Sequence, residues 1–357
     1  MLILRSHITI YKDDVKKFYF NKVQSCNIKS SWDTMTDTAE IVLPNYFIKS
    51  NRFNFIKSNI VRGQKIEIEL GYASKLVLCF TGYIKKITTD SPFTIFAEDY
   101  AYVLKQKTIT SWSKKVNTVK TLLTDLKAEL NISFPMNILS TKIDMNVGAF
   151  EVRDETIIAV LDRLKSKNLS LLSFFRNGEL FVGSPSFLAA EFPSKYGGNE
   201  YNFWFDGELV NIKYNNLIWN DETDIRQVIK GVIIKTDNSS TIVFAYYHNS
   251  VPTITTTQPD GNMITHFEYN ISQTDMNKML LEELQQINYT GWHGNFTTFG
   301  DKIYDGIGEA VEHGDKVYLR SYKEPEKSGK YLVKEVEINF GVDGYERIIT
   351  LDRKLTI

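Results

Sequence analysis

The feature that most constrains this chain is a three-part strand pattern that occurs twice. Its first copy comprises Gly63–Tyr72, Phe80–Ile87 and Pro92–Asp99. From Lys65 to Leu70, charged and apolar residues alternate, which predicts a strand with one buried face. Glycine and proline residues within and between the segments mark bends and breaks. The stretch therefore predicts an antiparallel meander.

The second copy lies near the C-terminus. It comprises Gly314–Tyr322, Gly329–Val336 and Tyr345–Asp352, in the same order. Glycine, lysine, alternating apolar residues and a closing tyrosine recur together, although the gaps between segments differ by several residues. We infer two related β-modules in one polypeptide.

Length and composition set the limits of the architecture. A chain of 357 residues predicts two or three domains. Lys and Arg total 42 against 43 Asp and Glu, so the global basic excess of a protein that grips nucleic acid along its surface is absent. The two cysteines, Cys26 and Cys79, are expected to be buried thiols, because a chain of this size needs no disulfide.

No targeting or membrane segment is expected from this sequence. No apolar run approaches the ~18 residues of a membrane-spanning helix, and the N-terminus has no apolar core typical of a signal peptide. We therefore expect a chain that is made and folded in a cytoplasm without membrane insertion.

The pattern along the chain predicts a mainly β (α+β) fold in four parts. Residues 1–107 are expected to form a first β-barrel module and residues 108–200 an inserted α/β domain. Residues 201–290 are expected to form a β-rich segment with a Thr-rich loop and a helix, which contributes to the second module. Residues 291–357 complete the second β-barrel module.

Three amphipathic helices are expected in this chain. The first covers 116–130, where leucines and valines recur at helical spacing. The second begins near Asp154 as its N-cap and is followed by a hairpin over 169–183. The third carries its apolar face from Met276 to Ile287. A polar, Thr-rich loop is expected from Asn249 to Asn262.

Residues that carry chemistry are sparse. The histidines are scattered and lack metal-ligand spacing: His7, His248, His266, His293 and His313. Gly306 and Gly308 lack the third glycine and following helix of a phosphate-binding loop. No Gly-x-Ser-x-Gly motif occurs. We predict no catalytic residue, no metal and no cofactor.

Two acidic clusters offer an alternative, because β-rich glycan hydrolases use carboxylate pairs. These are Glu98–Asp99 and Asp221–Asp224. Neighbouring residues of a strand point to opposite faces, so the favoured interpretation is structural. Trp292–His293, in an expected Gly-flanked turn, is the most enzyme-like position, and there the favoured interpretation is an aromatic anchor.

Two further groups have both a structural and a functional interpretation. Met276 and Met279 are expected in a helix core, and partner docking is the alternative. Lys85–Lys86 and Lys114–Lys115 are expected on solvated faces, and contact with a polyanion in a channel is the alternative.

Several of these segments resemble baseplate hub proteins of phage tails, called late control proteins in some contractile phages, with relatives in contractile injection machines. The resemblance covers most of the chain in order and is weakest over 184–265. Its carriers are Asp37–Pro44, Gly63–Ile68, Phe80–Ile84, Phe93–Asp99, Thr156–Gly183, Gly314–Val317, Gly329–Phe340, Gly344–Tyr345 and Leu351.

The resemblance implies a structural role. Such proteins form homotrimers in which each chain contributes two related barrel modules to a ring, so that three chains match a six-fold tail tube and a three-fold central spike. The expected partners are the tube, the spike and other baseplate proteins, with DNA or effector cargo passing through a central channel without specific binding. The expected location is the virion tail baseplate, assembled in the host cytoplasm, and wall cleavage is expected in another chain.

Two alternatives belong to other functional classes. One is a β-rich glycan hydrolase that uses the acidic clusters. The other is a glycan- or receptor-binding module at a tail tip, with Trp204, Trp219 and Trp292 as stacking platforms.

Overall fold

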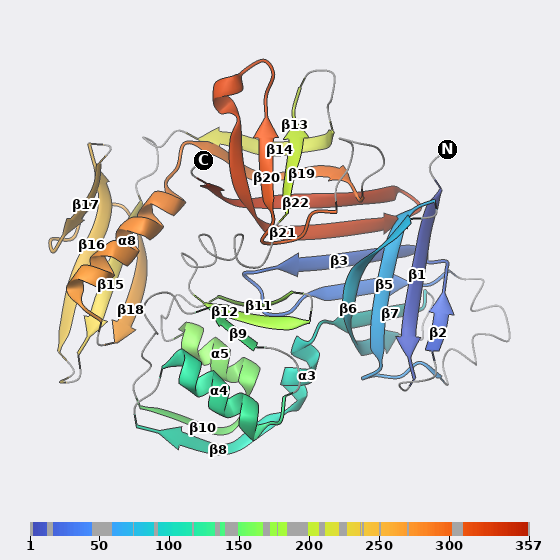
Figure 1. The fold of residues 1–357 in the computed structure, drawn as a ribbon, viewed down its shortest axis with the longest axis horizontal. Coiled ribbons are helices and arrows are strands. Elements are labelled where there is room, and N and C mark those ends of the chain that lie inside the picture. Colours follow the sequence, from blue (N-terminus) through green and yellow to red (C-terminus); the bar gives the residue numbers. More distant parts are fainter. Residues whose placement is uncertain are drawn as a thin grey trace.

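The computed structural model confirms a mainly β fold with a small helical part (Figure 1). It describes residues 3–12, 17–44, 59–73, 75–88, 92–115, 118–132, 136–139, 149–166, 172–176, 178–183, 199–206, 211–220, 227–235, 237, 239–249, 251–269, 271–301 and 310–355. The Asp221–Asp224 cluster and the Gly306–Gly308 segment lie outside these residues.

The first unit of the large sheet has the strand order β1-β5-β6-β7-β4-β3. In β5, apolar side chains are buried and the charged residues between them are half-buried, as the alternation predicts. A short strand, β2, extends the sheet beyond β1. The bounds are β1 Leu4–Tyr11, β2 Lys17–Phe20, β3 Ser25–Ser31, β4 Thr38–Val42, β5 Lys65–Tyr72, β6 Lys75–Thr88 and β7 Thr94–Glu98.

The second unit repeats this arrangement, with the strand order β13-β20-β21-β22-β19-β14. Each strand has its counterpart at the same place in the first unit. One difference is the outermost pair, because β13 is parallel to β20 whereas β1 is antiparallel to β5. The bounds are β13 Glu200–Trp204, β14 Ile212–Asn220, β19 Gly291–Phe299, β20 Lys316–Arg320, β21 Gly329–Gly341 and β22 Gly344–Leu355.

The turns that precede β5 and β20 show that the likeness extends to single hydrogen bonds. Gly63 and Gly314 both have positive φ, at 90° and 82°, which favours glycine. The N–H of Gly63 donates to the carbonyl of Ile84 at 2.8 Å, and the N–H of Gly314 donates to the carbonyl of Val333 at 2.8 Å. The two units are therefore structural repeats, as the sequence pattern predicts.

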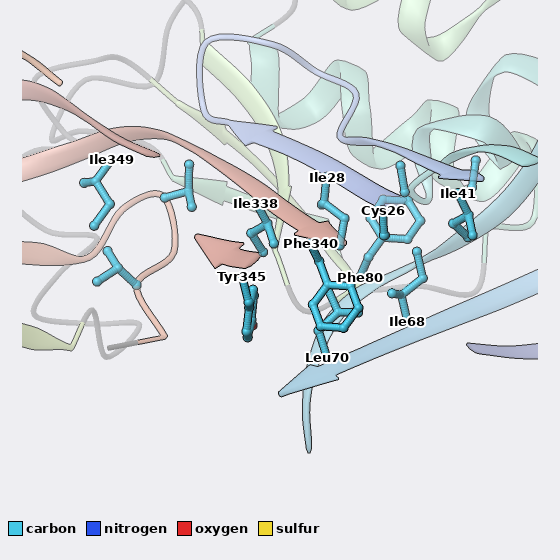
Figure 2. Close-up of a cluster of buried hydrophobic side chains, with 14 of the residues drawn as sticks. Cys26, Ile28, Ile41, Ile68, Leu70, Phe80, Ile338, Phe340, Tyr345 and Ile349 are labelled. Carbon is cyan, nitrogen blue, oxygen red and sulfur yellow. The ribbon is translucent and has the colours of Figure 1, made fainter. Parts of the chain in front are cut away.

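The two units are joined in one 13-stranded sheet. The C-terminal half of β21 pairs antiparallel with β3, from Glu335 opposite Ser31 to Gly341 opposite Ser25. Figure 2 shows side chains of both units, including Ile28 and Ile338, in one apolar cluster. The strand pairing between β21 and β3 therefore joins the two units through one shared apolar core.

An α/β insert follows β7 and lies beneath the large sheet in Figure 1. Its helices pack on a common apolar core with β8 and β10. Its three-stranded sheet contacts Trp32 and Leu332, which belong to the two different units. The bounds are α3 Ala101–Gln106, β8 Thr108–Lys114, α4 Val119–Glu129, β9 Met136–Leu139, β10 Phe150–Thr156, α5 Ile157–Ser166, β11 Leu172–Arg176 and β12 Glu179–Gly183.

The start of α5 differs from the prediction. Asp154 lies within β10 with φ of 49° and is not an N-cap. The Oγ1 of Thr156 instead accepts a hydrogen bond from the N–H of Ala159 at 3.2 Å, which is the bond an N-cap makes. Helix α4 lies within the predicted range of 116–130 and begins at Val119, with a capping box between Thr118 and Thr121.

A second appended unit separates β14 from β19. Four strands in the order β17-β16-β15-β18 carry α8 on one face. The expected loop from Asn249 to Asn262 is partly wrong, because it contains β17, whose threonines suit an edge strand. The bounds are β15 Gln227–Ile234, β16 Ser240–His248, β17 Val251–Thr255, β18 Asn262–Tyr269 and α8 Gln273–Ile287.

Among the described residues, no helix combines the length and apolar character needed to cross a membrane.

Candidate assembly surface

The outer edge of β14 is the first element of a candidate assembly surface. β14 ends the strand order of the large sheet, so this edge has no partner strand among the described residues. Tyr214 and Ile218 are 64% and 67% exposed. Edge strands that avoid association usually carry unpaired charge or proline, but the lysine of β14, Lys213, forms an ion pair with Glu346. The edge is thus a template for the addition of another strand.

The second element is the end of β6. Strand β5 pairs with β6 only from Lys75 to Tyr83. Residues 86–88 continue beyond this pairing and contact β7 on the opposite side. In the second unit, the corresponding stretch of β21 pairs with β3. The edge at 86–88 is therefore free, within the described part of the chain, where its counterpart is occupied.

The seam between β3 and β21 shows which side-chain contacts form when such an edge is paired with another strand. The Nδ2 of Asn27 donates to Glu337 Oε1 at 2.7 Å and to Asn339 Oδ1 at 2.6 Å. Lys29 lies 3.2 Å from the Glu337 carboxylate. Polar side chains thus reinforce the backbone pairing on one face, while apolar side chains pack on the other.

A buried arginine braces the second unit where it meets the first. Arg347 is 2% exposed; its Nε donates to the carbonyl of Gly300 at 2.5 Å and its Nη1 to that of Val311 at 2.8 Å. From the first unit, the hydroxyl of Tyr72 donates to the carbonyl of Tyr345 at 3.0 Å. The two bonds from Arg347 supply donors to carbonyls of the second unit, and the bond from Tyr72 links the two units.

The insert is held against the second unit by Arg176. Its Nη2 lies 2.9 Å from Asp315 Oδ1 and 3.0 Å from Glu312 Oε2, and its Nη1 donates to the carbonyl of His313 at 2.5 Å. Asp315 is fully buried and also accepts N–H bonds from Glu312 and Asn199. Sequence reasoning missed this pair, because its members are 139 positions apart.

A cavity of about 350 Å³ lies where both units and the insert meet, and Asp37, Asp99 and Arg176 are among its lining residues. Burial raises the pKa of Asp99 to about 7, although the N–H groups of Ala101 and Asp37 donate to its carboxylate. Burial and the adjacent Asp99 also hold the pKa of Asp37 well above its usual value. The cavity carries both signs of charge.

The predicted carboxylate pair Glu98–Asp99 is divided between two roles. Glu98 forms ion pairs with Lys85 at 2.5 Å and Lys105 at 2.8 Å. Burial acts to raise the pKa of Glu98, but the hydrogen bonds from these lysines outweigh it and the pKa lies below its usual value. Asp99 instead accepts the N–H of Ala101 at 2.9 Å, at the start of α3. Lys86, beside Lys85, lies over the Phe96 ring.

The tryptophans expected as a stacking platform make contacts within the fold. Trp219 and Trp292 are edge-to-face, with ring centroids 5.1 Å apart, and the Nε1 of Trp292 donates to the carbonyl of Lys327. Trp204 lies beneath the Arg320 guanidinium at 5.4 Å. Trp292 and His293 lie inside β19, so the expected turn at this position is wrong.

The remaining predicted positions have structural contacts. His293 stacks on Tyr289 with centroids 4.2 Å apart, and burial lowers its pKa. His313 is 3% exposed, and burial lowers its pKa to about 3. Met276 is buried against the sheet of the α8 unit, Met279 is half-buried, and Lys114 pairs with Asp125. Over the described ranges, no cluster of three acidic, histidine or cysteine side chains has the geometry of a metal site.

Both cysteines are free thiols. Cys26 is buried and Cys79 is half-buried, and burial raises the pKa of the Cys26 thiol. The Sγ of Cys79 lies 3.5 Å from the hydroxyl of Tyr345 and 3.8 Å from Arg347 Nη2, so it belongs to the contact between the two units.

Comparisons with known proteins relate this fold to phage tails. No protein-family model matches the sequence, and no curated protein matches it significantly. A tail protein from Neisseria meningitidis has a similar structure, with 13% identity, a TM-score of 0.60, and coverage of 98% of this chain and 96% of that one. The 43 kDa tail protein of prophage MuSo2 from Shewanella oneidensis has 12% identity, a TM-score of 0.56 and coverage of 98% of each chain.

A protein of the type VI secretion system of E. coli also shares the fold. It is described as structurally similar to the T4 bacteriophage tail proteins gp27 and gp5. Its identity to this chain is 9% and its TM-score is 0.53, with coverage of 93% of this chain and 73% of that one. At these identities the comparisons establish the fold.

Proposed function

We propose that this chain is the structural baseplate hub of a phage tail or a related injection machine. Three copies form a ring of six related units that joins a six-fold tail tube to a three-fold central spike. The observation that carries the proposal is the seam between β3 and β21, whose counterpart is unfilled in one chain. The shared fold of phage tail and type VI secretion proteins supports it.

The internal repeat supplies the geometry of the ring. β14 corresponds to β3, and β6 corresponds to β21. Repeating the seam between copies places β14 of one copy beside residues 86–88 of the next. Such a head-to-tail contact joins unlike faces, and it closes when the rotation per copy completes a circle. Two units per chain make three copies equivalent to six similar units, which matches the tube.

The same proposal accounts for the partners and the location. The ring surrounds a central channel through which DNA or effector cargo passes without specific binding, and the near balance of 42 basic and 43 acidic residues suits such a conduit. The tube, the spike and other baseplate proteins are the proposed partners, in the virion tail baseplate.

The proposal assigns no reaction to this chain. Assembly through strand edges needs shape and backbone pairing rather than catalytic groups. Glu98 belongs to one of the two acidic clusters that a glycan hydrolase would use, and it is paired with two lysines. Glu98→Gln is therefore expected to change no polysaccharide turnover, because wild type is expected to show none. Turnover that wild type performs and Glu98→Gln loses would contradict this.

Mass measurement in solution tests the ring. We expect the full chain, of 41.2 kDa, to assemble as a trimer by native mass spectrometry, alone or with its spike. Replacing Tyr214 and Ile218 together by lysine should abolish the trimer, because both side chains are exposed beside the edge that must pair. Val342→Lys is the matched control, since Val342 is 87% exposed in the turn between β21 and β22. A wild type that stays monomeric even with its spike, or a trimer that survives the double substitution, would contradict the proposal.

A further inference from the structure

The loop over residues 321–328, between β20 and β21, distinguishes the second unit from the first. In the first unit, β5 and β6 are joined by a tight turn in which Tyr72 and Lys75 still pair. In the second unit, the corresponding connection contains a short 3₁₀ helix, η2, over Pro325–Lys327. Only one of the two units in each chain carries this loop. In a ring of three chains the loop therefore occurs three times, although the ring has six related units.

Asp206, just after β13, fixes the start of this loop. Its carboxylate accepts hydrogen bonds from Ser321 Oγ at 2.9 Å, from the N–H of Tyr322 at 2.6 Å and from the N–H of Lys323 at 3.4 Å. The bond from Tyr322, followed by that from Ser321, holds the pKa of Asp206 below its usual value. The start of the loop is therefore held by a side chain that follows the neighbouring strand β13.

The end of the loop is fixed as well. The N–H of Ser321 donates to Ser328 Oγ at 3.0 Å, which closes the loop upon itself. The Nε1 of Trp292 donates to the carbonyl of Lys327 at 2.9 Å. Both ends of the loop are thus attached to the second unit. The loop backbone therefore loses less conformational entropy on binding a partner than a free loop would.

Tyr322 stands out on this rigid support. Its side chain is 75% exposed, while its own N–H is bonded to Asp206. Tyrosine is one of the residues that most often dominate the binding energy of protein interfaces, and a preorganised backbone increases that contribution. The loop is therefore built to present one aromatic ring to a partner.

We propose that Tyr322 is the anchor by which this chain binds the three-fold spike, with each spike subunit supplying an apolar pocket for one ring. This inference rests on the trimeric ring proposed above. A ring of three chains carries three such loops at three-fold spacing, and three of its six units carry the tight turn instead. A six-fold partner would find the loop at only half of its positions, whereas a trimer finds one for each subunit.

Binding of the purified spike protein of the same tail particle to the full chain tests this assignment. We expect equal numbers of the two proteins in the complex by native mass spectrometry. Tyr322→Ala should weaken the Kd by about 10- to 30-fold by calorimetry, and Tyr322→Phe should preserve it because the ring remains. Asp206→Ala should weaken binding by a smaller factor, since it frees the loop but keeps the ring. Val342→Ala, at the other end of β21, should bind like wild type.

The outcomes separate the two proposals. The docking assignment is overturned if Tyr322→Ala leaves the Kd unchanged or if wild type does not bind the spike. The proposal of a trimeric ring still stands in that case, provided that wild type is a trimer. Loss of the trimer in Tyr322→Ala also overturns the docking assignment, because the aromatic side chain of Tyr322 would then lie between copies of this chain. A wild type that remains monomeric in its complex with the spike, with binding that depends on Tyr322, overturns the trimeric ring and keeps the docking site.

Discussion

Gln64 and Asp315 occupy the same position in the two repeated units. The Oε1 of Gln64 accepts the N–H of Val61 at 2.9 Å, and the Oδ2 of Asp315 accepts the N–H of Glu312 at 2.8 Å. Both side chains therefore close the turn before an equivalent strand. The position is neutral in the first unit and charged in the second, where Arg176 of the insert supplies the opposite charge.

Because Asp315 is acidic where the first unit has the neutral Gln64, the second unit is expected to depend on Arg176 for stability. Arg176→Met should lower the free energy of unfolding by about 3–5 kcal/mol in urea titrations, because it leaves the carboxylate of Asp315 buried without its cation. Adding Asp315→Gln, which copies the residue of the first unit, should recover much of this loss. A single variant as stable as wild type would contradict the interpretation.

Arg347 predicts a loss that lysine does not repair. Its guanidinium donates to two buried carbonyls, those of Gly300 and Val311. Arg347→Met should cost about 2–4 kcal/mol, because both carbonyls lose their donor. Arg347→Lys should remain well below wild type, since a single ammonium lacks the planar fork. Chemical denaturation followed by tryptophan fluorescence measures both, and full stability of the lysine variant would refute the assigned role.

Gly300 predicts a steric limit in the shared core of the two units. A Cβ at this position would lie 2.0 Å from Cδ2 of Tyr345, whose ring is buried. Gly300→Ala should therefore lower stability by about 1–3 kcal/mol or more. A variant without the Tyr345 ring is the control: Gly300→Ala should lower stability less in a Tyr345→Leu background than in wild type. Additive effects in thermal melts would argue against direct contact.

Glu268 predicts a pH dependence that one substitution removes. It is 2% exposed in β18, and burial raises its pKa to about 7, with the nearby His266 acting in the opposite direction. Between its ordinary pKa of 4.5 and about 7, the folded state binds more protons than the unfolded state, so this group lowers stability as pH rises through that window.

Glu268→Gln keeps the shape and removes the titration. It should leave stability nearly unchanged at a pH near 4.5 and raise it by roughly 2–3 kcal/mol above pH 7, where wild type must hold a buried charge. The difference between the two proteins cancels the contributions of other groups, such as Asp99 and His313. A pH-independent difference in unfolding free energy would show that Glu268 does not titrate in this way.

Much of the fold was predictable from local patterns. Alternation from Lys65 to Leu70 identifies β5, and leucine spacing identifies α4, because one buried face imposes its period on the sequence. The local errors have local causes. Asp154 is of a residue type that favours N-caps, but it lies in β10 with a positive φ. The glycines beside Trp292 suggested a turn, but they belong to β19.

The candidate assembly surface was less accessible to sequence reasoning. In the structure β3 has buried residues whereas β14 has none. This difference follows from how the strands pack, so the sequence alone could not rank the two strands by exposure. The sequence pattern places Tyr322 at the end of the segment Gly314–Tyr322, whereas in the structure it lies in the loop after β20. The acceptor of its N–H, Asp206, is more than a hundred positions earlier, so no local pattern indicates the loop.

The sequence by itself determined that the chain contains two copies of one sheet unit, since period and turn residues are local properties that survive in each copy. Only the tertiary structure decided that β21 pairs with β3 and that β14 keeps an open edge. Strand pairing is made by backbone groups that every residue shares, so the choice of partner depends on which edges packing brings together.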